Sequence, residues 1–125
     1  MILADTSVWI DHLRKGDKTL GALLQKGNVL MHPMVRGELA CGSLRDRALL
    51  LRLWQNLPAL SPVTDEAAMA FIEAKGLMGK GIGFIDVHLL ASVVTQQGAW
   101  LWTRDKRLAA LAERLKLAWK EKVQR

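Results

Sequence analysis

The chain has 125 residues, the size of one ordinary domain with a hydrophobic core of its own. Half of its residues are hydrophobic and 24% are charged, which is typical of a globular protein in water. No apolar run reaches the roughly 18 residues of a membrane span, no secretory signal opens the sequence, and the single cysteine, Cys41, cannot form an internal disulfide. We therefore expect one cytoplasmic domain over residues 1–125, without membrane association, in which Cys41 packs among small residues rather than acting as a nucleophile.

The chain is basic, with 18 lysines and arginines against 12 aspartates and glutamates, a formal net charge of +6. If four of the acids belong to one site, as argued below, 18 basic residues stand against 8 acidic ones elsewhere, a net +10. Such a surface favours a polyanionic partner such as nucleic acid. Because many small basic proteins bind nothing specific, composition alone leaves this interpretation open.

The first strand is predicted over residues 1–4, an apolar run that ends in a carboxylate and two hydroxyls at Asp5, Thr6 and Ser7. With no polar residue before Asp5, the run is typical of a strand buried on both faces. The strand places Asp5 at its carboxyl end, where ligands bind in open α/β sheets. Asp5 or Thr6 could also cap the helix that follows.

Helical and extended patterns alternate along the rest of the chain. Helices are predicted from apolar residues at helical spacing bounded by glycine, proline and capping residues, and strands from short apolar runs. The predicted helices cover residues 7–14, 19–27, 34–44, 45–57, 65–75 (capped by Thr64), 84–94 and 106–115, and the further strands cover 28–32, 99–103 and a last piece at 117–119. This alternation indicates a small α/β fold with a parallel sheet between helices.

Residues 76–83 hold four glycines in eight positions. A phosphate-binding P-loop does not fit, because Lys80 is followed by Gly81 rather than serine or threonine and no strand leads into the loop. We expect a mobile loop beside the site, with Lys80 able to contact a phosphate.

Acidic residues recur where the predicted elements meet. The strands at 1–4 and 99–103 run into Asp5 and Asp105, and the carboxyl ends of parallel strands lie at the same edge of a sheet. Asp86 stands in the first turn of its helix, where it either caps the helix or points into a site. Glu38, taken alone, only complements a helix dipole.

Several carboxylates at one site repel each other unless a cation neutralises them, and oxygen-rich sites suit Mg²⁺ or Mn²⁺. Residues 104–125 form a basic flank, with eight basic and three acidic residues. A nuclease needs both features, because the flank binds phosphates and the centre binds the cation. Arg104, Lys106 and Arg107 are the best candidates for phosphate contacts, although a solvated basic face explains them nearly as well.

Four motifs together resemble those of a known family, the PIN-domain ribonucleases. In size and spacing the chain is most similar to the VapC-type toxins of bacterial toxin–antitoxin pairs, and the resemblance covers essentially the whole chain. The motifs are Asp5-Thr6-Ser7, Glu38-Leu39 with Gly42 soon after, the run from Phe84 to Ala91 around Asp86, and Thr103-Arg104-Asp105.

The resemblance implies an α/β, PIN-like three-layer sandwich in which helices flank a small central parallel sheet. It also implies an endoribonuclease dependent on Mg²⁺ or Mn²⁺, which hydrolyses RNA phosphodiesters with metal-activated water and forms no covalent intermediate. Such a toxin is held inactive by a cognate antitoxin, a separate chain, and is usually a homodimer. The implied catalytic and metal-binding carboxylates are Asp5, Glu38, Asp86 and Asp105; Thr6 and Thr103 are the supporting hydroxyls, with Ser7 a weaker candidate.

Two alternatives remain at the level of sequence. An inactive PIN-fold RNA-binding module would keep the fold, but such modules generally lose acids and this chain keeps all four. A phosphoaspartyl phosphatase would need a second aspartate two residues after Asp5, where Ser7 stands. Other residues receive structural interpretations: Asp11 as a solvated helix acid, His12, His32 and His88 as ordinary polar or core histidines, and Trp9, Trp54, Trp100 and Trp102 as core or interface.

The excess of basic residues predicts how RNA affinity depends on salt concentration. RNA affinity is expected to fall steeply as salt rises, because phosphate contacts release counterions. Filter binding at low and at physiological salt measures this, and a flat affinity over that range would contradict the basic-surface argument.

Overall fold

The computed structural model describes residues 1–121 of the chain. Within this range, seven helices and three short strands follow one another, and no helix is long and apolar enough to cross a membrane. The elements are β1 (Ile2–Ala4), α1 (Thr6–Lys15), α2 (Lys18–Gln25), β2 (Val29–Leu30), α3 (Pro33–Ala40), α4 (Arg47–Asn56), α5 (Asp65–Lys75), α6 (Phe84–Thr95), β3 (Trp100–Trp102) and α7 (Lys106–Arg114).

The three strands form a parallel sheet in the order β2-β1-β3. The central strand β1 is buried along its whole length, as its unbroken apolar run predicts. Single parallel bridges widen the sheet at both edges, from Met31 to Ala59 and from Leu101 to Ala118, so the predicted piece at 117–119 does pair with β3. Asp5 therefore leaves the sheet at its centre.

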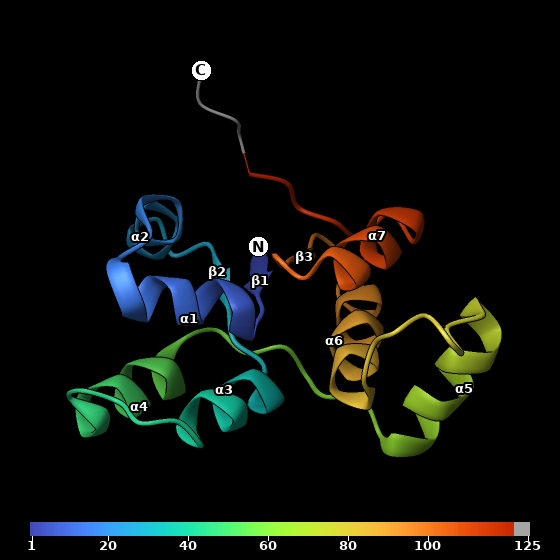
Figure 1. The fold of residues 1–125 in the computed structure, drawn as a ribbon, viewed down its shortest axis with the longest axis horizontal. Helices are drawn as coiled ribbons and strands as arrows, with labels where there is room; N and C mark the ends of the chain where they lie inside the picture. The colour runs from blue at the N-terminus through green and yellow to red at the C-terminus, as the bar shows by residue number, and fades with distance from the viewer. Residues whose placement is uncertain (122–125) are drawn as a thin grey trace.

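The helices lie on both sides of the sheet (Figure 1). Helices α1 to α4, coloured blue to green, gather on one side, and α5 to α7, coloured yellow to red, on the other. Side chains from both groups and from the strands join one hydrophobic core that includes Leu3, Trp54, Leu90 and Leu108. The predicted α/β fold with a small parallel sheet between helices is thereby confirmed.

Side chains placed just before the helices fix where the helices begin. Of the two candidate caps of α1, Asp5 is the one that acts, accepting from the Val8 amide at 3.3 Å, and Thr64 caps α5 as predicted, accepting from the Ala67 amide at 3.0 Å. Gly16, at φ +74°, ends α1 in a backbone conformation that favours glycine. Asp17 then caps α2 through the Leu20 amide at 2.9 Å.

The predicted boundary between the helices at 34–44 and 45–57 is wrong. Helix α3 ends at Ala40 and α4 begins at Arg47, so Leu44 and Arg45 lie in the connecting loop. The Arg47 guanidinium donates to the Ala40 and Gly42 carbonyls at 2.7 and 3.2 Å, which satisfies groups that a helix end leaves unpaired. Asp46, just before α4, adopts a left-handed conformation with φ 53°.

His32 ties α3 to α6. Its Nδ1 accepts from the Met34 amide at 3.1 Å and so caps α3, which assigns the ring proton to Nε2, 3.0 Å from Ser92 Oγ on α6. The side chain is fully buried, and burial together with nearby His88 lowers the pKa of His32 to about 4. The neutral ring is therefore part of the native structure.

This pKa predicts a loss of stability in mild acid. Above pH 6.5 His32 is neutral in both states; below it the unfolded chain binds a proton that the folded protein rejects until about pH 4. The free energy of unfolding should fall across that window by up to ~3 kcal/mol on account of this residue.

Urea unfolding near pH 7 and near pH 5 measures the loss. His32→Asn keeps an acceptor for the Met34 amide but does not titrate, so its stability should change less between the two pH values. An equal change in the variant and the wild type would assign the pH dependence to other groups.

Candidate functional site

Asp5 lies at the end of β1 and is only 6% exposed. Two hydroxyls donate to its two carboxylate oxygens: Ser7 Oγ to Oδ1 at 2.5 Å and Thr103 Oγ1 to Oδ2. Burial raises the pKa of Asp5, and the hydrogen bonds from Ser7, Thr103 and the Val8 amide offset only part of that effect. The carboxylate is thus held in one orientation in a place that disfavours its negative charge.

The two hydroxyls are themselves fixed by the segment after β3. The Arg104 amide donates to Ser7 Oγ at 3.0 Å, and the Asp105 amide donates to Thr103 Oγ1 at 3.1 Å. Each hydroxyl therefore accepts a hydrogen bond from a backbone amide and donates one to an oxygen of Asp5. Ser7, the weaker candidate in the sequence, contacts Asp5 as directly as Thr103 does.

The other predicted hydroxyl, Thr6, donates to Glu38 Oε1 at 2.9 Å. This bond joins the first turn of α1 to α3, from which Glu38 projects. The signal for Glu38 in the sequence was a motif alone, since its place in a helix did not separate it from a surface acid.

Asp86 stands in the first turn of α6, where its Oδ2 lies 3.4 Å from the Gly83 amide. Its pKa is raised, first by burial and then by the negative charges of Asp5, Asp105 and Glu38, against the effect of the Gly83 amide. Because the charges of Asp5, Asp105 and Glu38 all act on Asp86, the four predicted acids lie near one another around the start of α6. They come from the end of β1, from α3 and from the starts of α6 and α7.

Asp105 also caps its helix. Its Oδ1 accepts from the Arg107 and Leu108 amides at 2.9 and 3.0 Å. One of its two carboxylate oxygens therefore binds the first turn of α7.

Among residues 1–121, none of the four carboxylates forms an ion pair with a lysine or arginine. An all-oxygen donor set of this kind suits a hard divalent cation, whose positive charge would offset the negative charges that raise the pKa of Asp86. Over the same range, no three acidic, histidine or cysteine side chains already stand as a ligand set for one ion. The residues present fit such a cation in charge and in the chemistry of their oxygen donors.

Arg104 is placed differently from the predicted phosphate contact. Its guanidinium pairs with Asp11 at 2.7 Å, Asp17 at 2.5 Å and Glu121 at 2.9 Å, which argues against a phosphate contact. Asp11, expected to be solvated, is a partner in these ion pairs. The sequence offered no signal for Glu121, whereas Asp17 could have been found as the residue that follows Gly16 and caps α2.

The other three predicted cations remain on the surface. Lys80, Lys106 and Arg107 are exposed, and the Arg107 side chain lies against the glycine-rich loop. A Cβ added at Gly81, whose φ is +80°, would come within 2.6 Å of Arg107 Cδ. The loop and the start of α7 are therefore neighbours, and the absence of a side chain at Gly81 makes room for Arg107.

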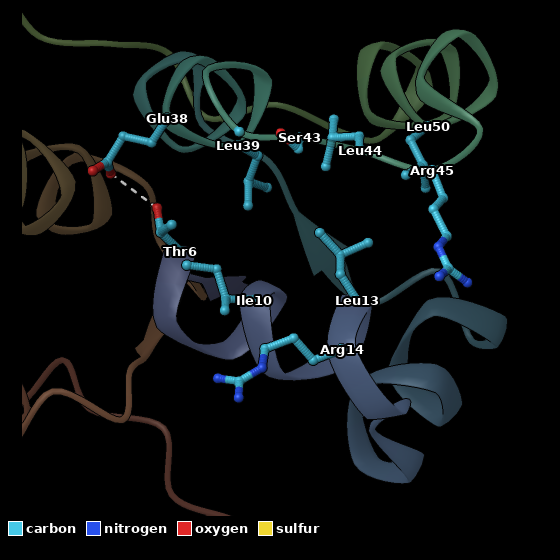
Figure 2. Close-up of a pocket in the computed structure, with 11 residues that line it drawn as sticks. Thr6, Ile10, Leu13, Arg14, Glu38, Leu39, Ser43, Leu44, Arg45 and Leu50 are labelled. Atoms are coloured by element: carbon cyan, nitrogen blue, oxygen red, sulfur yellow. Dashed lines mark hydrogen bonds between the residues drawn. The ribbon is translucent and has the colours of Figure 1, made fainter.

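A groove of about 540 Å³ opens beside the Thr6–Glu38 hydrogen bond (Figure 2). Its walls come from α1, α3 and the loop before α4, with Ile10, Leu13 and Leu44 among the apolar side chains. Arg14 and Arg45 add positive charge. Sequence reasoning missed this groove, because the wrong helix boundary at 44–45 hid the loop that forms one wall.

The tryptophans mostly occupy the core, as expected. Trp9, Trp54 and Trp102 are at most 3% exposed, whereas Trp100, at the start of β3, is 43% exposed. Buried indoles are not available to stack on bases.

The family model for the PIN domain matches residues 2–114. The chain belongs to the PIN-domain family. This PIN domain is 44% identical over 123 residues to Ribonuclease VapC32 from two strains of Mycobacterium tuberculosis, CDC 1551 / Oshkosh and ATCC 25618 / H37Rv, covering 98% of the chain and 99% of the relative. It also resembles the crystal structure of PAE2754 from Pyrobaculum aerophilum, with a TM-score of 0.55, 18% identity and coverage of 91% and 90% of the two chains, which supports the fold alone.

The raised pKa of Asp5 predicts how this PIN domain responds to loss of the charge. Because burial outweighs the hydrogen bonds that favour the carboxylate, Asp5→Asn should leave the free energy of unfolding in EDTA unchanged within ~1 kcal/mol, or raise it. Urea unfolding in EDTA at neutral pH measures the change. A loss of several kcal/mol would instead identify Asp5 as chiefly the structural cap of α1.

Proposed function

We propose that this PIN domain, as one domain over residues 1–125, is a metal-dependent endoribonuclease and the toxin of a VapC-type toxin–antitoxin pair. Near full-length similarity to Ribonuclease VapC32 supports the activity. What supports the proposal is that the negative charges of Asp5, Asp105 and Glu38 all act to raise the pKa of Asp86, while none of the four acids pairs with a lysine or arginine among residues 1–121. An inactive RNA-binding module has no need to keep four unpaired carboxylates in one place.

The cation in this proposal is Mg²⁺ or Mn²⁺, held by Asp5, Glu38, Asp86 and Asp105. When bound, such an ion polarises a phosphoryl oxygen and lowers the pKa of a water molecule, so that hydrolysis of RNA needs no protein nucleophile. The protein's part is positioning. Ser7 and Thr103 hold both carboxylate oxygens of Asp5, and Thr6 orients Glu38.

Lys80, Lys106 and Arg107 are the proposed phosphate contacts, since all three are exposed beside Asp105 or in the loop that Arg107 touches. Positive charge here holds the RNA backbone while the acidic centre stays free for the ion. The proposed partners are an RNA substrate, a separate antitoxin chain and a second copy of the protein in a homodimer, in the cytoplasm.

The proposal predicts RNA cleavage with Mg²⁺ or Mn²⁺ and none in EDTA. Asp86→Asn should lower the cleavage rate at least ~100-fold, because it removes one carboxylate from the ion. Glu73→Gln is the matched control, since Glu73 is an exposed acid of α5 and the change alters net charge equally.

Gel analysis of labelled RNA measures the rates for the wild type and both variants. Cleavage in EDTA, or an Asp86→Asn variant as active as the control, would contradict the proposal. Binding of RNA without any cleavage by the wild type would favour the inactive module.

A further inference from the structure

Arg104 connects three segments that are far apart in the sequence. Its Nη1, Nη2 and Nε each meet a different carboxylate: Asp11 on α1, Asp17 before α2 and Glu121 in the C-terminal segment. The guanidinium also lies over the Trp102 ring, with Cζ 5.3 Å from the ring centroid. We call these four groups around Arg104 the arginine clamp.

The clamp is specific to the planar, multivalent guanidinium. A lysine would offer a single nitrogen, whereas Arg104 offers three donor nitrogens at fixed angles, one for each carboxylate. Trp102 also holds Glu121 in place. Its Nε1 donates to Glu121 Oε1 at 2.7 Å, and the same oxygen accepts from Arg104 Nε at 2.9 Å. Glu121 lies beyond residues 2–114, the part matched by the PIN model, so the clamp includes a segment outside that match.

The backbone of Arg104 contacts the site. Its amide holds Ser7 Oγ, which donates to Asp5 Oδ1, and the next amide, of Asp105, holds Thr103 Oγ1, which donates to Asp5 Oδ2. The Asp5 amide in turn donates to the Trp102 carbonyl at 3.0 Å. Whatever fixes the Arg104 side chain therefore fixes the two amides that orient Asp5.

We propose that Arg104 is a positioning residue, whose clamp holds the 103–105 segment so that Ser7 and Thr103 keep Asp5 oriented toward the divalent cation. This rests on the proposed function for the identity of the ion. Asp11, Asp17 and Glu121 act through Arg104 and touch neither the ion nor RNA.

If Arg104 bound a phosphate of RNA instead, removal of an acid of the clamp would have a different effect on RNA affinity. Three carboxylates around one guanidinium leave a local charge of −2, which repels a phosphate. If Arg104 bound RNA, removing one of those acids would free it and strengthen RNA binding. If Arg104 positions Asp5, the same change loosens the site and leaves RNA affinity unchanged.

Two variants separate these roles. Arg104→Gln removes the guanidinium, and Asp17→Asn removes one ion pair while keeping an oxygen that can accept from the Leu20 amide and cap α2. Asp17→Asn is nearly isosteric, so it keeps the test decisive if Arg104→Gln does not fold. Glu73→Gln again controls for the loss of one negative charge.

Three measurements apply to each folded variant: Mn²⁺ affinity by electron paramagnetic resonance, amide hydrogen exchange of residues 104 and 105 without metal, and RNA affinity in EDTA as a function of salt. Both clamp variants should weaken Mn²⁺ binding about 10-fold and speed exchange of the two amides, because a small misplacement of Asp5 is enough to weaken a ligand set. The salt slope of RNA binding should not change.

A salt slope lowered by about 0.7 in Arg104→Gln, with tighter RNA binding in Asp17→Asn, would overturn the proposal in favour of a phosphate contact. Unchanged Mn²⁺ affinity and exchange rates in Asp17→Asn would overturn it as well. A wild type that neither binds Mn²⁺ nor cleaves RNA would count against the proposed function; the exchange of the metal-free amides still decides whether the clamp fixes the segment.

Discussion

The burial of Asp5 at the end of the central strand is the constraint on which the rest of the site depends. A carboxylate in that position loses its hydration, and hydrogen bonds replace part of it. Two hydroxyls and the Val8 amide of α1 donate to Asp5, and two backbone amides in turn donate to the hydroxyls. These bonds orient the side chain, but burial outweighs them and raises the pKa of Asp5. The structure thus holds a negative charge in place at a position that favours a cation.

Charge is separated over a short stretch of chain. Arg104 forms ion pairs with three acids. Asp105, the next residue, is one of the four candidate site acids, and none of these has an ion-pair partner among residues 1–121. Lys106 and Arg107 then face solvent. The four consecutive residues from 104 to 107 therefore supply the arginine of three ion pairs, a candidate site carboxylate and two exposed cations.

The sequence predicted the parts of this arrangement that follow from periodicity. Buried strands at 1–4 and 99–103 placed Asp5 and Asp105 at one edge, and the parallel β1–β3 pairing agrees. Glu38 entered through family resemblance, since its local pattern suits any helix acid. The arginine clamp could not be predicted, because the partners of Arg104 lie 93, 87 and 17 residues away and pair only after the core has assembled. The boundary at residues 40–47 depended in the same way on one side chain, Arg47, folding back on α3.

We propose that Asp5, Glu38, Asp86 and Asp105 together bind a divalent cation. Crystals of the wild-type protein grown with Mn²⁺, measured at a wavelength where manganese scatters anomalously, test it most directly. An anomalous peak is expected within coordination distance of carboxylate oxygens from Asp5 and at least two of the other three acids. A manganese peak elsewhere, or no peak at this site at saturating Mn²⁺, would contradict it.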